Sequence, residues 1–178
     1  MIHIREIENL KCQGNYKKAK EKIEKDLLKY TDDYRFYEEL ADICLYEGNI
    51  KKAEMAMSLA QKLNPDSATG TYLIGYINIS KGNFVLGVKF LEKANTLFPN
   101  NAEILRNLGW GYNMLGEIKK GIIILKRALN LAPDDKLIME DLGVALIGDG
   151  NTELGEFYLK KAGKEFKIQE LRDIMKIK

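Results

Sequence analysis

The sequence is poor in the residue types that metal and redox sites most often use. Its 178 residues include one histidine and two cysteines. Cys12 and Cys44 form no C-x-x-C pair, and His3 is the lone histidine, so the pattern argues against a Cys/His metal site. We therefore expect no metal and no cofactor, and we expect both cysteines to be reduced thiols of a cytoplasmic protein.

Long apolar runs and an excess of one charge are also missing. No run approaches the ~20 residues that span a bilayer, and the N-terminus lacks the apolar stretch of a signal peptide. The 28 basic and 26 acidic side chains leave a formal net charge of +2. This balance predicts neither a nucleic-acid partner nor direct insertion into a membrane.

Catalytic motifs are lacking as well. The chain has no phosphate-binding G-x-x-x-x-G-K-[ST] motif. His3 lies at the terminus, where it completes no Ser/His/Asp or Cys/His arrangement. Acidic pairs such as Glu38–Glu39 are more typical of a solvated helix surface than of acid–base chemistry. We predict that the protein is not an enzyme.

Glycine, by contrast, is abundant, and its spacing is regular. Five glycines recur at intervals of 34 residues, at Gly14, Gly48, Gly82, Gly116 and Gly150. The prolines keep the same interval, as do four alanines: Pro65, Pro99, Pro133, Ala60, Ala94, Ala128 and Ala162. Such a period predicts repeats. The repeats are residues 1–33, 34–67, 68–101, 102–135 and 136–169, followed by a tail.

Each repeat reads as two helices joined by a tight turn. In the fourth, Leu105, Leu108 and Tyr112 are spaced as on one helix face, and a second apolar series follows Gly116. Glycine adopts the left-handed conformation needed to reverse the chain at little cost. Pro133 then ends the second helix.

This pattern resembles the tetratricopeptide repeat family over nearly the whole chain. The signature positions in the fourth repeat are Leu108, Gly109, Tyr112, Gly116, Gly121, Leu125, Ala128 and Pro133. The resemblance implies an all-α, right-handed superhelical solenoid, forming a single domain over residues 1–178. The first repeat fits worst, because Glu6, Asp26 and Thr31 replace residues that are apolar, Ala and Pro elsewhere. Ile168, Leu171, Ile174 and Met175 predict an amphipathic capping helix within 168–177.

Six further glycines recur at two fixed places of the expected helices, where each costs ~1 kcal/mol relative to alanine. They are Gly75, Gly109, Gly143, Gly87, Gly121 and Gly155. We attribute them to close approach of the paired helices. Since repeat two has Ala41 and Ala53 at these places, we predict a tighter crossing in repeats three to five.

In this family the first helices of the repeats line a concave groove that holds a partner's peptide or helix. By position, the groove residues would be Ile4, Glu8, Glu38, Asp42, Tyr72, Tyr76, Ile79, Arg106, Trp110, Asn113, Glu140, Val144 and Ile147. The N-terminal half is acidic and the C-terminal half aromatic and apolar, which favours a partner with an apolar or aromatic anchor near Lys or Arg. Trp110 is the strongest candidate; the alternative is that the aromatic residues are core.

The outer face predicts a second interface. Its apolar positions are Met55, Val85, Leu86, Ile123 and Phe157. They indicate self-association, unless neighbouring helices bury them. We therefore predict a protein–protein interaction module or adaptor. The alternative is a self-assembling scaffold, a homo-oligomer of the kind found among relatives in bacterial organelles and in secretion or pilus assembly.

Overall fold

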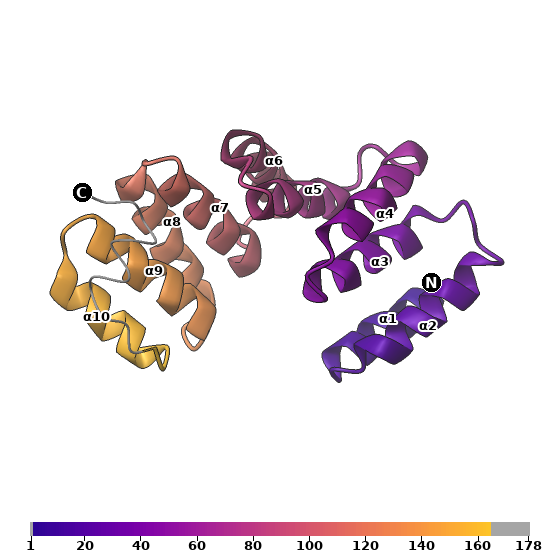
Figure 1. Ribbon diagram of the computed structural model, residues 1–178, viewed down its shortest axis with the longest axis horizontal. Helices are drawn as coiled ribbons and strands as arrows, with labels where there is room; N and C mark the ends of the chain where they lie inside the picture. Colours follow the sequence, from indigo (N-terminus) through magenta and orange to yellow (C-terminus); the bar gives the residue numbers. More distant parts are fainter. Residues whose placement is uncertain (1, 165–178) are drawn as a thin grey trace. The chain divides into compact units, whose positions relative to one another are not determined.

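A computed structural model describes residues 2–164 of the protein, and within this range the chain is all-α, as predicted (Figure 1). These described residues form ten helices and no strand. The odd-numbered helices, here called A helices, are α1 (Ile2–Cys12), α3 (Tyr34–Tyr46), α5 (Ala68–Ser80), α7 (Ala102–Met114) and α9 (Lys136–Gly148). The even-numbered B helices are α2 (Tyr16–Leu27), α4 (Ile50–Leu63), α6 (Phe84–Leu97), α8 (Ile118–Leu131) and α10 (Thr152–Lys161).

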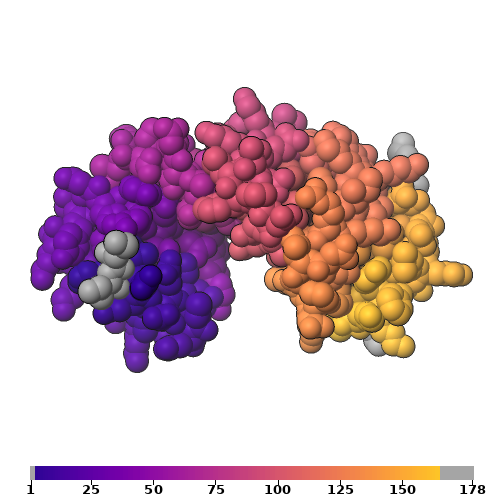
Figure 2. Space-filling view, turned by 180° about the vertical axis from the view of Figure 1, so that it is seen from behind, coloured from indigo at the N-terminus to yellow at the C-terminus, as the bar shows by residue number. Residues whose placement is uncertain are grey.

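The chain divides into two compact units, residues 1–81 and 82–178. The first unit holds α1–α5, and the described part of the second holds α6–α10. Figure 2 shows the surface of each, with the first unit in indigo to purple and the second in pink to yellow. That the five repeats form a single domain stays a prediction. The predicted capping helix at 168–177 lies outside the described residues.

The five periodic glycines reverse the chain between A and B helices, as the sequence predicts. Their φ angles run from 72° at Gly48 to 87° at Gly150, in the left-handed region. The hydrogen bonds are those of a Schellman turn. The Gly116 amide donates to the Asn113 carbonyl over 3.0 Å, and the next amide, that of Glu117, donates to the Tyr112 carbonyl over 3.0 Å.

A second periodic column starts the A helices. Asp33, Ser67, Asn101 and Asp135 stand at intervals of 34 residues, and each side chain accepts a hydrogen bond from a backbone amide of the helix that follows. Such caps satisfy amides that otherwise lack a partner, and each stabilises its helix by ~1 kcal/mol.

The helix glycines of repeats four and five mark close approach of A and B helices, as predicted. A Cβ at Gly121 would lie 2.7 Å from the Gly109 carbonyl oxygen, and one at Gly155 would lie 2.7 Å from the Gly143 oxygen. The backbones therefore meet at these glycines, where no side chain fits.

Two B helices depart from the regular pattern. α4, α6 and α8 have 14 residues, whereas α2 has 12 and α10 has 10. α10 ends early because Gly163 takes a left-handed φ of 78°. The Gly163 amide donates to the Lys160 carbonyl over 3.0 Å. The second helix of the fifth repeat is thus shorter than its counterparts in repeats two to four.

The misfit Asp26 of repeat one is buried, in the column that holds alanine elsewhere. Its carboxylate lies 3.1 Å from Nδ1 of His3 and 3.4 Å from Nζ of Lys22. His3 therefore helps to join α1 to α2, a role that its place at the terminus did not suggest.

Each unit has its own apolar core. In the first unit, a cluster that includes Ile7, Ile23 and Phe36 joins α1, α2 and α3. A second cluster, which includes Ala41, Met57 and Leu73, joins α3, α4 and α5. In the second unit, the core clusters lie across α8, α9 and α10, and Trp110 of α7 packs against one of them. The residues are Ile122, Leu125, Leu142, Ala145, Leu146, Val144, Ile147 and Leu159.

Candidate partner-binding site

The A helices present the predicted groove residues, and in the first unit several of them are not available at the surface. Glu38 is only 5% exposed. Its Oε1 lies beside Gly70 in the first turn of α5, where a Cβ on Gly70 would come within 2.8 Å. Burial raises the pKa of Glu38, although the Ser67 side chain and the Gly70 amide oppose that rise. Glu38 thus joins α3 to the positive end of α5.

Lys11 neutralises part of the predicted acidic surface. Its Nζ lies 2.7 Å from Oε2 of Glu39 and also contacts the Asp42 carboxylate. Burial lowers the pKa of Lys11, but Asp42 and Glu39 outweigh this effect, so the pKa is raised and the ammonium stays charged. Glu8 is exposed and has no ion-pair partner within residues 2–164. The surface around the predicted groove positions of the first unit is therefore less acidic than those positions alone indicate.

The tyrosines of α5 form a pair. Tyr72 and Tyr76 stack with ring centroids 6.3 Å apart, and both are partly buried. Ile79, one turn further on, is 7% exposed and belongs to the core. Ile4 of α1 is partly buried and packs against the cluster around Ile7.

Trp110 is the main apolar feature of the A helices in the second unit. Its ring is partly buried and packs against Val144, Ile147 and Leu159. Val144 and Ile147 are 8% and 9% exposed, so they pack against the indole and offer little surface to a partner themselves. The exposed part of Trp110 therefore lies on a rigid apolar base.

Arg106 is held by a residue that sequence reasoning missed. Its Nε donates to Oδ2 of Asp141 over 2.6 Å, which links α7 to α9. Burial raises the pKa of Asp141 to about 6, although the Arg106 guanidinium opposes the rise. Glu140 pairs with Lys164 over 3.3 Å. A partner's carboxylate would have to compete with Asp141 for Arg106.

Asn113 lies inside the molecule and not on the predicted surface. It is 4% exposed, and a Cβ on Gly121 would overlap its side-chain oxygen. Neither its Oδ1 nor its Nδ2 has a hydrogen-bond partner among the described residues. The close approach of α7 and α8 encloses this amide, which therefore cannot contact a partner.

The predicted outer-face residues are all exposed. The exposed fractions are 70% for Met55, 74% for Val85, 45% for Leu86, 62% for Ile123 and 50% for Phe157. Neighbouring B helices therefore do not bury them, which was the alternative interpretation.

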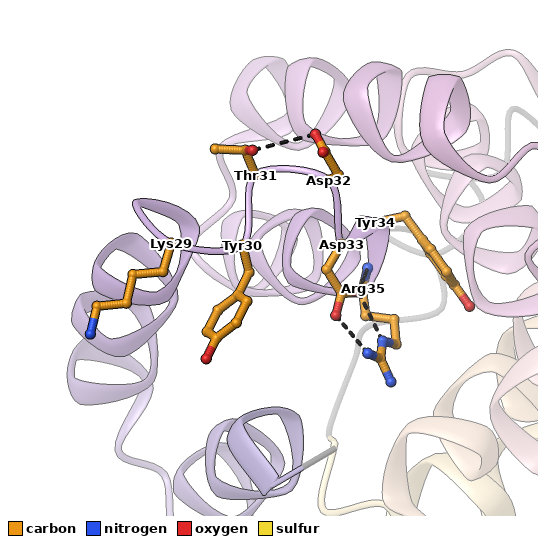
Figure 3. A pocket seen from close by; sticks show the side chains of 7 residues that line it. All are labelled: Lys29, Tyr30, Thr31, Asp32, Asp33, Tyr34 and Arg35. Atoms are coloured by element: carbon orange, nitrogen blue, oxygen red, sulfur yellow. Dashed lines mark hydrogen bonds and ion pairs between the residues drawn. The ribbon is translucent and has the colours of Figure 1, made fainter.

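A shallow hollow of about 480 Å³ lies along the longer link between α2 and α3 (Figure 3). Seven consecutive residues, 29–35, line it. Two of its charged groups pair with each other, because Arg35 donates to both Asp33 oxygens over 2.8 and 2.6 Å. The Tyr30 ring stacks on Phe36 at 5.9 Å. We interpret the hollow as the structural start of α3.

Other classes of site find no support in residues 2–164. They contain no group of three or more His, Cys, Asp or Glu side chains placed to bind a metal ion. Within the same range, every helix is too short or too polar to cross a membrane.

Comparison with known proteins agrees with this architecture. The family model described as tetratricopeptide repeat matches residues 34–67, the second repeat. No curated protein matches the sequence significantly.

Solved structures with a similar fold have low sequence identity to this chain. MamA from Desulfovibrio magneticus RS-1 has a TM-score of 0.69 and 17% identity, over 97% of this chain and 94% of that one. PilF from Pseudomonas aeruginosa has a TM-score of 0.71 and 16% identity, over 98% of this chain and 83% of that one. YrrB is described as a TPR protein with an unusual peptide-binding site. It has a TM-score of 0.63 and 17% identity, over 90% of this chain and 82% of that one.

Paired helices turning at left-handed glycines define the class, that of helical-hairpin repeat proteins. The family match in repeat two and the similar structures make it more specific. The chain has the tetratricopeptide repeat fold.

Proposed function

We propose that the protein is an interaction module whose A helices bind a peptide or helix of a partner protein, with Trp110 as the principal anchor. The observation that carries this proposal is the position of Trp110. It is the only tryptophan of the chain, and it remains partly exposed on a base of Val144, Ile147 and Leu159. An indole held rigidly on an apolar base buries a large area on binding and loses little entropy.

The chemistry of the site favours an apolar or aromatic anchor over a charged one. In the second unit Asp141 pairs the charge of Arg106, and in the first unit Lys11 pairs that of Asp42, so a partner gains less from its own charges than the sequence indicated. In the first unit, the stacked pair of Tyr72 and Tyr76 offers a second partly exposed aromatic contact. The described peptide-binding site of YrrB, on a similar fold, supports peptide capture as a general mode.

A display selection of random peptides against the full chain tests this function. We expect the enriched peptides to share an aromatic or large apolar residue. Their affinity should fall at least about tenfold with Trp110→Ala, because a central aromatic anchor carries much of the binding energy.

Phe157→Ala is the matched control, since it removes an exposed aromatic ring from a B helix. Both variants should keep the circular dichroism spectrum of the wild type. Peptides that bind Trp110→Ala as tightly as the wild type would contradict the role of the A helices.

Self-association is a second candidate, favoured by the exposed apolar side chains of the B helices. If these side chains join copies of the chain, light scattering should show a mass that rises with concentration. Leu86→Asp should then return the protein to a monomer. A constant monomer mass at high concentration would count against this function.

A further inference from the structure

The outward faces of the B helices in the second unit combine apolar and basic side chains. α6, α8 and α10 contain eight basic residues and three acidic ones, and all eleven are exposed. The basic residues are Lys89, Lys93, Lys119, Lys120, Lys126, Arg127, Lys160 and Lys161, and the acidic ones are Glu92, Glu153 and Glu156. The excess of positive charge is local, since the chain carries +2 overall.

Helical spacing places apolar and basic side chains on the same faces. On α8, Ile123 lies three and four residues before Lys126 and Arg127, so the three share one side of the helix. On α10, Phe157 stands in the same relation to Lys160 and Lys161. We call these six residues the basic–apolar face.

Most of the basic side chains of this face form no ion pair with the described residues. Lys126, Arg127 and Lys160 have no ion-pair partner among residues 2–164. Lys161 lies 4.9 Å over the ring of Phe157, which it leaves 50% exposed. Unpaired cations beside exposed apolar groups fit a ligand that carries both apolar groups and negative charge.

The sign of the charge selects among occupants. A second copy using the same face would bring Lys126 and Arg127 against their own equivalents, and like charges repel. A membrane-surface helix keeps its apolar face free of charge, whereas here basic residues lie on the same side as Ile123 and Phe157. An amphipathic helix with acidic residues beside its apolar ones matches both features.

We infer that the basic–apolar face of α8 and α10 docks an acidic amphipathic segment of a partner protein. The apolar residues of that segment would cover Ile123 and Phe157, and its carboxylates would pair with Lys126, Arg127 and Lys160. This surface belongs to the B helices and does not depend on Trp110, so a partner could occupy it whether or not the A helices are occupied.

A designed helical peptide is the probe for this surface. It carries leucines along one side with glutamates next to them, and the control peptide has glutamine in place of glutamate. Fluorescence anisotropy with the full chain should show saturable binding of the glutamate peptide. We expect this binding to weaken with rising salt, and the glutamine peptide to bind at least about tenfold more weakly.

Protein variants locate the contact. The double variant Lys126→Glu with Arg127→Glu, and separately Ile123→Asp, should each weaken binding of the glutamate peptide at least about tenfold. All these positions are exposed, so the variants should keep the wild-type thermal unfolding curve. Reversal of the exposed pair Lys17 and Lys18 on α2 is the matched charge control and should leave the affinity unchanged.

Five results would overturn the inference. The glutamine peptide binds as tightly as the glutamate peptide, or the Lys17 and Lys18 control weakens binding as much as the α8 variants do. Vesicles containing phosphatidylserine bind through Ile123 while the peptide does not, which assigns the face to lipid. Light scattering shows oligomers that the α8 variants dissolve, which assigns it to a second copy. Loss of peptide binding only with Trp110→Ala would indicate the A helices instead.

Discussion

At the scale of single residues, glycine has two distinct roles in this protein. The turn glycines adopt a positive φ and have open space where a Cβ would lie. The helix glycines of repeats four and five have the reverse arrangement, with helical backbone and no space. The first role is required by conformation and the second by packing, so substitutions at the two kinds of site fail for different reasons.

Gly121→Ala tests the packing role. Alanine gains ~1 kcal/mol of helix propensity, but its Cβ would lie 2.7 Å from the Gly109 carbonyl oxygen, which α7 holds in place. We expect overpacking to prevail, lowering the free energy of unfolding by roughly 1–3 kcal/mol in urea. Ser58→Ala, at an exposed position of α4, should change it by less than ~0.5 kcal/mol. A stabilised Gly121→Ala would show that the helices do not meet there.

Asp141 gives a pH dependence of known sign. Its folded-state pKa of about 6 exceeds the ordinary value of 3.8, so the folded state binds the proton more tightly than the unfolded state. The stability gained from this proton amounts to at most about 3 kcal/mol. It is fully present below about pH 4 and is lost as the pH rises through about 6.

The difference between wild type and Asp141→Asn isolates this group, because Glu38 and Glu39 also have raised pKa values. Urea unfolding at steps from pH 4 to pH 7 should show the wild type losing stability relative to the variant. Parallel pH profiles for the two proteins would mean that Asp141 titrates normally.

At the scale of helices, most boundaries could be predicted from the sequence, because glycine and proline mark them directly. The two irregular B helices could not. The end of α10 depends on the left-handed conformation of Gly163, which lies outside the period. Asp26 read as a misfit, because its pairing with His3 joins residues far apart in the chain. A pattern of residue types contains no information on such a contact.

The capping residues predict a contrast between two chemically identical substitutions. The Asn101 side chain accepts from the Ile104 amide over 3.0 Å at the start of α7, whereas Asn151 makes no side-chain capping bond to α10. Asn101→Ala should therefore lower the free energy of unfolding by ~1 kcal/mol, and Asn151→Ala by a few tenths. Chemical denaturation of both variants checks this, and equal losses would mean that the side-chain cap does not stabilise α7.

At the scale of the whole molecule, the fold could be predicted more fully than the binding site. The 34-residue period alone predicts paired helices, because every repeat buries its apolar face against its neighbours in the same way. Groove positions carried over by register do not include the contacts between neighbouring helices: Glu38 lies against α5, Asn113 lies against α8, and Arg106 pairs with Asp141. These positions stay a prediction. The apolar residues of the outer face are exposed in the structure, which the sequence left open, and their part in self-association stays a prediction.

The central claim is that a partner binds on the A helices at Trp110, and the chain's single tryptophan allows a direct test. With a selected peptide that contains no tryptophan, all indole emission comes from this side chain, so the titration reports on its surroundings alone. We predict a saturable blue shift as the peptide covers the ring, with the same midpoint as the binding measured by anisotropy. Saturable anisotropy with unchanged tryptophan emission would contradict the account, because the peptide would then bind elsewhere.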